Sequence, residues 1–352
     1  MKWFISVKKF VNFLKNKVLF RCDGANIPEI GTGHIFRCLT IAKYLKKRFG
    51  LRKEDIVFLT RSSSKYNIGF DILKKNEFRV VAIKSKKLKL NSNDELKYLN
   101  KNPSDLLIID RLGKTKKNFV KKLDNSFNKK IIIDDSSANR KYFDISLNPL
   151  IHNVKKVKNS FIGFDYLILP VYFYKYKRNT SKNRNIFIFF GGHDPKKLTI
   201  KIIKMLNKNN LDLTLFVSSI FKKLINKVII DKKIIFYEQD KYIEKLSLCK
   251  IAITAGGMGL FDNIVMKKKI ICIPQYKHQE VNAKRIASQD AINLLNLSDK
   301  NFEKKFNEKF IKLYKNVSLN KRIILKQNKI SNMKKLHKTL TLIGKTYVQS
   351  KN

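Results

Sequence analysis

The sequence predicts an α/β fold with two Rossmann-like domains whose parallel sheets face each other across a cleft. Short runs of Ile, Val, Leu and Phe alternate with segments of helical spacing in both halves of the chain. The runs are almost continuously apolar, which is typical of strands buried on both faces of a parallel sheet. A polar, lysine-rich stretch at 172–185 interrupts the pattern, which then starts again. With 352 residues, the chain is long enough for two domains that each have a core.

The interruption divides the chain into five expected parts. They are a basic amphipathic extension (1–16), an N-terminal domain (17–172), a linker (173–185), a C-terminal domain (186–310) and a helical tail (311–352). The expected strands are 18–22, 56–59, 80–83, 106–109 and 131–133 in the first domain, and 186–190, 213–217, 234–237, 251–254 and 270–273 in the second.

A glycine turn follows the first expected strand. Residues 31–37 read Gly-Thr-Gly-His-Ile-Phe-Arg and open a segment with apolar residues at helical spacing. Glycine lets the backbone approach a ligand closely, and the N–H groups and dipole of a helix N-terminus favour an anion. His34 adds a side chain suited to proton transfer near neutral pH, where a P-loop would carry lysine. The turn predicts proton transfer on a phosphorylated substrate; the alternative is a histidine that only hydrogen-bonds its own loop.

A second glycine turn lies in the C-terminal half. Ala255, Gly256 and Gly257 follow the strand expected at 251–254, and a helix is expected to begin near Met258. A diphosphate would sit at such a helix N-terminus. Asp262 lies about one turn into this helix, where it can accept hydrogen bonds from ribose hydroxyls. The alternative is a capping or solvent-facing aspartate.

Other polar residues follow the ends of expected strands, the edge at which open α/β sheets bind ligands. His278 and Gln279, with Asn282 soon after, follow the strand at 270–273 and can touch phosphate or sugar hydroxyls; the alternative is that they are ordinary loop residues. Residues 191–195 form a third glycine turn, whose His193 either faces the cleft or is merely solvated.

Carboxylates also follow strands in the first domain. Asp110 and the pair Asp134 and Asp135 each come after a buried strand, where a carboxylate binds substrate hydroxyls or caps the next helix. Asp135 precedes two serines and is interpreted as a cap.

The net charge of +49 suggests a nucleic-acid-binding protein as one hypothesis. The basic residues, however, are mostly lysine and are spread along the whole chain, and isoleucine and asparagine are also abundant, as AT-rich codons would produce. The sequence has no zinc-finger, helix-turn-helix or RNA-binding signature. We therefore expect no specific nucleic-acid partner, only weak and salt-sensitive binding to polyanions.

Residues 2–15 place apolar side chains on one face of a helix and lysines largely elsewhere. Such a helix can lie on an anionic membrane surface. The alternatives are a helix packed on the body of the protein and an incorrectly assigned start codon. Peripheral membrane contact through 2–15 thus stands as a hypothesis; no apolar run approaches the roughly 20 residues of a membrane span.

The cysteines indicate neither a zinc site nor a disulfide framework, because Cys22, Cys38, Cys249 and Cys272 are far apart in apolar elements. Buried free thiols suit a reducing cytoplasm, which is the expected location. The chain also has no loop with an Asp-x-Asp pair and no Gly-x-Ser-x-Gly nucleophile elbow. We expect a monomer without metal or cofactor that acts on a nucleotide-bound substrate.

Several motifs, in their order along the chain, resemble those of one family. The set is similar to the nucleotide-sugar hydrolase of pseudaminic acid biosynthesis and the related spore-coat polysaccharide proteins, over residues 17–286. The wider relatives are GT-B glycosyltransferases, so the resemblance implies a GT-B-like fold. The motifs that carry it are 21–23, 31–34 with Arg37, 109–110, 134–135, 163, 166–169, 191–195 and 255–257.

The resemblance implies a reaction. Water attacks the anomeric carbon of a UDP-2,4-diacetamido-2,4,6-trideoxy sugar, inverts that carbon and releases UDP. His34 matches the family's catalytic histidine, the general base that takes a proton from water. Ala255, Gly256, Gly257 and Met258 would hold the nucleotide, with Asp262 on the ribose where the family usually has glutamate. The residues expected to contact the substrate are Gly31, Gly33, Arg37, Asp110, Gly191, Gly192, His278, Gln279 and Asn282.

The sequence departs from the family pattern near the sugar. Leu112 stands where the hydrolases tend to carry tyrosine, and His278 stands where they usually have asparagine. Pro170 and Tyr172 replace the usual arginine and glutamate of the domain junction. These changes affect the residues that would select the sugar or an acceptor.

Three functions follow as alternatives. The first is a UDP-sugar hydrolase in nonulosonic acid or surface polysaccharide biosynthesis. The second is a GT-B glycosyltransferase that passes the sugar from a UDP-sugar to a surface-glycan acceptor. The third is a polyanion- or nucleic-acid-binding protein, which a stripe of basic residues on one face would support.

Overall fold

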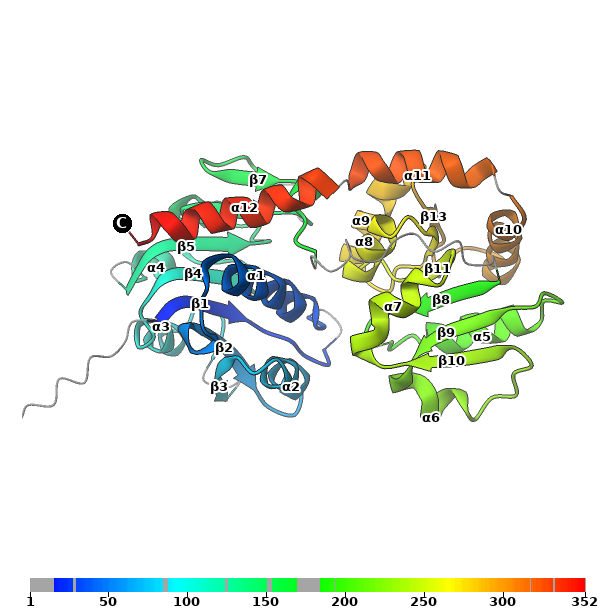
Figure 1. Ribbon diagram of the computed structural model, residues 1–352, viewed down its shortest axis with the longest axis horizontal. Helices are drawn as coiled ribbons and strands as arrows, with labels where there is room; N and C mark the ends of the chain where they lie inside the picture. The colour runs from blue at the N-terminus through cyan, green and yellow to red at the C-terminus, as the bar shows by residue number, and fades with distance from the viewer. Residues whose placement is uncertain are drawn as a thin grey trace, which may run out of the picture.

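The computed structural model describes residues 16–27, 30–84, 88–123, 126–150, 154–169, 184–192, 194–316, 318–331 and 333–351. Figure 1 shows two α/β units side by side, which confirms the predicted fold class. The extension expected at 1–16 lies almost wholly outside the described residues, as does the linker expected at 173–185.

The N-terminal domain is built on a seven-stranded sheet in the order β3-β2-β1-β4-β5-β6-β7, in which all neighbouring strands are parallel. The strands are β1 (Asn16–Cys22), β2 (Ile56–Ser62), β3 (Arg79–Lys84), β4 (Ser104–Asp110), β5 (Phe127–Ile133), β6 (Ile145–Asn148) and β7 (Ser160–Ile162). The helices between them are α1 (Gly33–Phe49), α2 (Asn67–Lys75), α3 (Asn93–Asn100) and α4 (Lys117–Lys121).

Both faces of this sheet are buried, as the continuous apolar runs predict. Along β1, Val18 and Phe20 join a core cluster that includes Ile41 and Leu45 of α1. Leu19, between them, belongs to the cluster on the opposite face. Successive residues of a strand point to opposite faces, so an alternating pattern of apolar and polar residues would have left one face polar.

The C-terminal domain has a six-stranded parallel sheet in the order β10-β9-β8-β11-β12-β13. Its strands are β8 (Asn185–Phe189), β9 (Thr214–Ser218), β10 (Lys233–Tyr237), β11 (Ile251–Thr254), β12 (Lys269–Cys272) and β13 (Asn293–Leu294). Its helices are α5 (Leu198–Asn207), α6 (Lys222–Ile225), α7 (Tyr242–Ser247), α8 (Met258–Val265), α9 (Lys277–Ala287) and α10 (Phe302–Lys315).

The ten predicted strands all occur within one or two residues of their predicted ends, apart from strands that extend further than predicted in the first domain. The strands β6, β7 and β13 were not predicted. β7 and β13 have only three and two residues, too few for an apolar run to stand out from the surrounding loops. In β6, Ser146 and Asn148 alternate with the apolar residues, so no continuous apolar run marks this strand.

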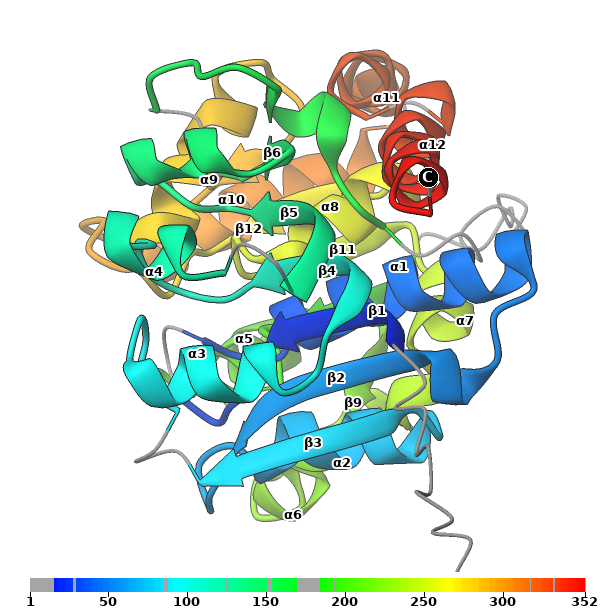
Figure 2. The same ribbon diagram turned by 90° about the vertical axis from the view of Figure 1, so that its left-hand side faces the viewer.

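The tail forms two helices that connect the domains. α11 (Ser318–Ile330) contacts α8 of the C-terminal domain, whereas α12 (Met333–Gln349) returns to the N-terminal domain and contacts α1 and β5 (Figures 1 and 2). The ring centroids of Phe49 and Tyr347 lie 5.1 Å apart, and Asn128 donates a hydrogen bond to the Ser350 carbonyl. α12 therefore completes the core of the N-terminal domain.

The segment before the expected linker also joins the domains. Phe164, Leu167 and Leu169 are buried in a core cluster of the C-terminal domain, and the ring of Phe164 lies 5.1 Å from that of Phe261 on α8.

In the part of the chain that the structure describes, every helix is too short or too polar to span a lipid bilayer.

Candidate active site where the two domains meet

His34 lies in the first turn of α1, at the carboxyl edge of the N-terminal sheet. Its Nδ1 lies 2.6 Å from Oδ1 of Asp110, the last residue of β4, and its side chain is 15% exposed. An ionised carboxylate only accepts hydrogen bonds, so Nδ1 carries the proton and donates it. Nε2 is then the nitrogen that can take a proton from a bound group, the arrangement of an oriented general base.

Asp110 is fully buried, yet it remains ionised at neutral pH. Burial alone would raise its pKa, but the charges of Arg37 and His34 and their hydrogen bonds outweigh burial and hold the pKa of Asp110 at about 2. Arg37 binds both carboxylate oxygens at 2.6 Å, in a bidentate pair. Cys38, one residue further along α1, lies with its Sγ 3.7 Å from Asp110 Oδ2.

Arg37 also connects Asp110 to the loop after β5. Its Nη1 donates to Oδ2 of Asp134 at 2.5 Å, and the other oxygen of Asp134 accepts from the backbone N–H of Leu150. Asp134 has a φ of 52°, in the left-handed region that few non-glycine residues adopt. Arg37 and Asp110 are both buried. Asp110 contacts His34, and Arg37 contacts Asp110. The direct substrate contacts expected of Arg37 and Asp110 remain predictions.

The glycine turn before His34 lies against the C-terminal domain. Gly31 has a φ of 56°, a conformation that glycine adopts at little cost. A methyl group added to Gly33 would lie 3.5 Å from Cγ of Met258, the first residue of α8. One added to Gly192 would lie 4.0 Å from the hydroxyl oxygen of Thr32. The tertiary structure thus brings all three predicted glycine turns together.

The second glycine turn packs closely against α9. A methyl group on Gly256 would lie 2.5 Å from the backbone oxygen of Gln279, so only glycine fits there. The Gln279 side chain accepts a hydrogen bond from the backbone of Gln275, and Gln275 in turn donates to the carbonyl of Phe190. α8 begins at Met258, as predicted, after Gly257, which has no side chain to cap the helix. The N-terminus of α8 therefore points its first amides at this junction.

Asp262 lies one turn into α8 and is half-buried. Burial raises its pKa to about 7, against a smaller lowering by the hydrogen bond from Tyr242 of α7. The Tyr242 ring also packs edge-on against Phe189 of β8, which places this carboxyl among aromatic side chains. Contact with a ribose stays a prediction.

The remaining predicted residues lie around the same edge. His278 is exposed and stacks on Tyr276 with ring centroids 5.7 Å apart, whereas Asn282 is buried on α9. Gly191, after β8, has a φ of 96°. His193 lies outside the described residues. Asp135 accepts hydrogen bonds from the backbone of Ser137 and Thr115. The N-cap of the 3-10 helix that follows (Ala138–Tyr142) is Ser137, so Asp135 does not cap that helix as predicted but joins two loops.

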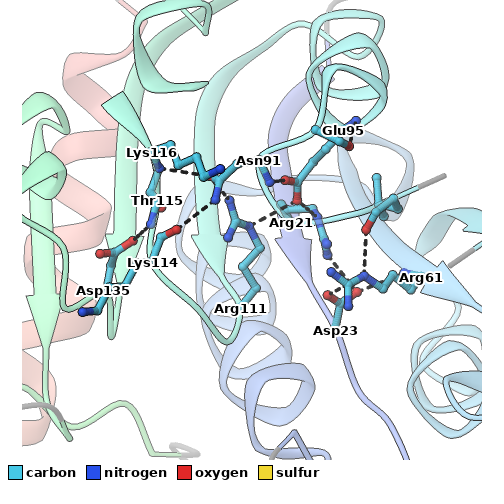
Figure 3. A network of polar contacts seen from close by, with 12 residues as sticks. Arg21, Asp23, Arg61, Asn91, Glu95, Arg111, Lys114, Thr115, Lys116 and Asp135 are labelled. Carbon is cyan, nitrogen blue, oxygen red and sulfur yellow. Dashed lines mark hydrogen bonds and ion pairs between the residues drawn. The ribbon is translucent and has the colours of Figure 1, made fainter. Parts of the chain in front are cut away.

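A second charged network lies on the opposite face of the N-terminal sheet (Figure 3). Arg21 of β1 is fully buried and contacts Asp23 at 2.8 Å and Glu95 of α3 at 2.7 Å. Arg111, next to Asp110, lies 3.2 Å from the same Glu95 oxygen, and burial lowers its pKa to about 10. Arg61 of β2 reaches Asp23 through its backbone N–H. The network joins β1 and β2 to the segments that follow β3 and β4.

Glu95, Arg61 and Arg111 were not predicted from the sequence. The one sequence signal for this network is Arg21. It is an arginine inside an otherwise apolar expected strand, and a buried arginine needs a carboxylate partner. Its partner Glu95 is 74 residues away and could not be found from spacing. Among the described residues, no three His, Cys, Asp or Glu side chains gather closely enough to hold a metal ion.

Comparison with known sequences finds two relatives, while no family model matches the chain. The uncharacterized protein MJ1062 of Methanocaldococcus jannaschii is 29% identical over 291 residues, 75% of this chain and 56% of that protein. The spore coat polysaccharide biosynthesis protein SpsG of Bacillus subtilis is 27% identical over 299 residues, 77% of this chain and 81% of that protein. The chain thus spans little more than half the length of the first relative.

Comparison with solved structures shows the fold. Acinetobacter baumannii MurG superposes with a TM-score of 0.66 at 16% identity, over 94% of this chain and 99% of that one. The spinosyn forosaminyltransferase SpnP gives a TM-score of 0.62 at 13% identity, over 94% and 99% of the two chains. The chain therefore has the GT-B fold of these glycosyltransferases and is similar in sequence to a protein of polysaccharide biosynthesis.

Proposed function

We propose that the protein breaks the bond between the anomeric carbon and the diphosphate of a nucleotide sugar, with His34 as the general base. The observation that carries the proposal is the contact of His34 with Asp110 beside Met258 at the start of α8. A hydroxyl nucleophile would give its proton to Nε2 of His34 as its oxygen attacks the anomeric carbon. Asp110 would stabilise the imidazolium that forms, and such general-base help is typically worth about 10²–10⁴ in rate.

The departing diphosphate would lie at Ala255, Gly256 and Gly257. Glycine at positions 256 and 257 would allow the backbone to approach phosphate oxygens, and the N-terminus of α8 carries partial positive charge. Both features favour the negative charge that develops on the leaving group. A spinosyn rhamnosyltransferase with this fold has been solved with thymidine diphosphate, which supports a nucleoside diphosphate as the ligand class.

Hydrolysis is the leading form of this reaction. Water would be the nucleophile, the product would have the inverted configuration, and the substrate would be a UDP-2,4-diacetamido-2,4,6-trideoxy hexose. The support is the set of motifs shared with the pseudaminic acid hydrolase and the similarity to the spore coat polysaccharide protein.

A second candidate is transfer of the sugar to an acceptor hydroxyl of a surface glycan. The observation that favours it is Leu112, which follows Asp110 by two residues and is 51% exposed. An exposed leucine at the sheet edge that carries His34 offers an apolar contact to an acceptor molecule larger than water.

Release of UDP from a panel of UDP-sugars, with water as the only acceptor, tests the two forms. Free sugar and UDP from the 2,4-diacetamido-trideoxy compound, with little from UDP-N-acetylglucosamine, would support hydrolysis. Tight UDP binding without release would point to transfer. Failure of UDP to bind at all would contradict both.

A further inference from the structure

An apolar and basic surface lies on the C-terminal domain, outside the residues assigned to the site. Between β9 and β10 the chain forms a short 3-10 helix, η6 (Ser219–Phe221), then α6 and a loop. Ile220, Leu224 and Ile229 are 57%, 40% and 91% exposed. We define the α6 surface as these three aliphatic residues with the lysines around them, Lys222, Lys223, Lys227 and Lys232.

The apolar side chains of this surface are not the ones that hold the segment in place. Ile225 is buried, and Phe221 and Ile230 pack against the core of the domain. Ile220, Leu224 and Ile229 alternate with these anchors and face away from the core. Single exposed aliphatic residues are common, whereas three within ten residues of chain, interspersed with lysines, indicate a partner.

The charges indicate what kind of partner fits. Residues 219–234 contain five lysines and one acidic residue, Asp231. Lys222 places its ammonium 5.9 Å from the ring centroid of Phe236, so its stem lies along the sheet while its charge stays at the surface. A partner must therefore be apolar where Ile229 enters it and negatively charged around that point.

We propose that the α6 surface binds the headgroup region of an anionic lipid membrane. The aliphatic side chains would enter the boundary between headgroups and acyl chains, and the lysines would lie at the level of the lipid phosphates. A nucleic acid would engage the lysines but would leave Ile229 in water, so it explains only half of the surface. The proposal needs neither the assigned reaction nor the segment at 2–15.

The position of the surface agrees with this proposal. β9 is parallel to β8 and β11, so η6 leaves the sheet at the edge that carries Gly191 and Ala255. In Figures 1 and 2, α6 lies on the same side of the molecule as α2, and α11 and α12 lie on the opposite side. α2 ends in Lys74 and Lys75, both exposed. α2 and α6, one from each domain, thus lie on one side of the molecule, and each carries exposed lysines.

Co-sedimentation of the full chain with vesicles tests the proposal. We expect binding to phosphatidylcholine vesicles that contain phosphatidylglycerol, and none to phosphatidylcholine alone. Ile229→Asp should lower the partition coefficient about tenfold or more, because it removes one inserted aliphatic side chain and adds a negative charge. Leu325→Asp is the matched control, since Leu325 is 64% exposed on α11, and it should bind as the unaltered chain does.

Unaltered binding of Ile229→Asp would overturn the proposal and assign any membrane contact to another part of the chain. So would failure of the unaltered chain to bind anionic vesicles. A second variant locates the contact: Ile229→Trp in a Trp3→Phe background, which removes the one natural tryptophan. Its fluorescence should shift to shorter wavelength on anionic vesicles and be quenched by brominated acyl chains; fluorescence that stays as in water would also overturn it.

Discussion

Oδ1 of Asp110 lies 2.6 Å from Nδ1 of His34, and the two residues are 76 positions apart in the chain. The same oxygen lies 2.6 Å from Nη2 of Arg37, so a permanently charged guanidinium keeps ionised the carboxylate that contacts the histidine. This arrangement fixes which imidazole nitrogen carries the proton. Substitution of His34 and Asp110 one at a time can therefore test the role of each residue.

Replacement of His34 should abolish turnover but not nucleotide binding. We expect His34→Ala to lower the rate of UDP release by about 10²–10⁴, because only the proton acceptor is lost. The dissociation constant for UDP, measured by calorimetry, should change little. His337→Ala is the control, since His337 is an exposed histidine on α12. A His34→Ala enzyme within about tenfold of the original rate would show that His34 is not the base.

Asp110→Asn should impair both turnover and stability. The amide can hold the imidazole in the other tautomer, so we expect turnover to fall by about 10² or more. Arg37 would also lose its bidentate carboxylate partner, at a cost of about 3 kcal/mol in the free energy of unfolding. Asp212→Asn, which alters an ion pair between Arg184 and the 81% exposed Asp212 side chain, should change neither.

The stability loss of Asp110→Asn should depend on pH. The pKa of Asp110 is lowered to about 2 from 3.8, so the ionised carboxylate adds stability that is complete above the unfolded pKa. That contribution is lost as the pH falls through about 2. Urea unfolding should therefore show the two proteins converging in strong acid. A difference that stays constant from neutral pH to pH 2 would contradict the charged pairing.

Asp262 predicts the opposite dependence on pH. Its folded pKa of about 7 lies above the 3.8 of the unfolded chain, so ionisation at neutral pH opposes folding. This penalty is absent below pH 3.8, grows as the pH rises toward 7 and is complete above that. Asp262→Asn should thus be more stable than the original chain at pH 8, by about 1–2 kcal/mol for a half-buried group, and equal to it at pH 4. Equal stability at both pH values would contradict the raised pKa.

Glu95→Ala should strongly lower the stability of the folded protein, although Glu95 lies outside the candidate active site around His34. Arg21 and Arg111 would both keep buried charges without this partner, and removal of one member of such a group costs about 3–5 kcal/mol. The matched control is Glu303→Ala, which breaks an exposed pair with Lys208 that is worth about 0–1 kcal/mol. Denaturant midpoints of the two variants, measured side by side, check the difference.

Much of the fold could be read from local pattern. Continuous apolar runs predict buried parallel strands because both faces of each strand must be covered, and Leu19 and Phe20 of β1 point to opposite cores. A glycine turn can mark a close contact, as at Gly256, where an added side chain would collide with the backbone of Gln279. β7 and β13 were not predicted because two or three residues show no periodicity, and β6 was not predicted because polar residues interrupt its apolar pattern.

Which residues meet was decided only by the tertiary structure. The sequence by itself determined that His34 opens a helix and that Asp110 ends a strand. It could not determine that β1 lies between β2 and β4, which sets Cys22 level with Asp110 and brings α1 over that carboxylate. Strand order depends on the packing of the whole sheet, because a buried parallel strand offers similar edges to every neighbour. The partners of Arg37 and Arg21 were therefore fixed by long-range packing, while the identity of each strand and turn was local.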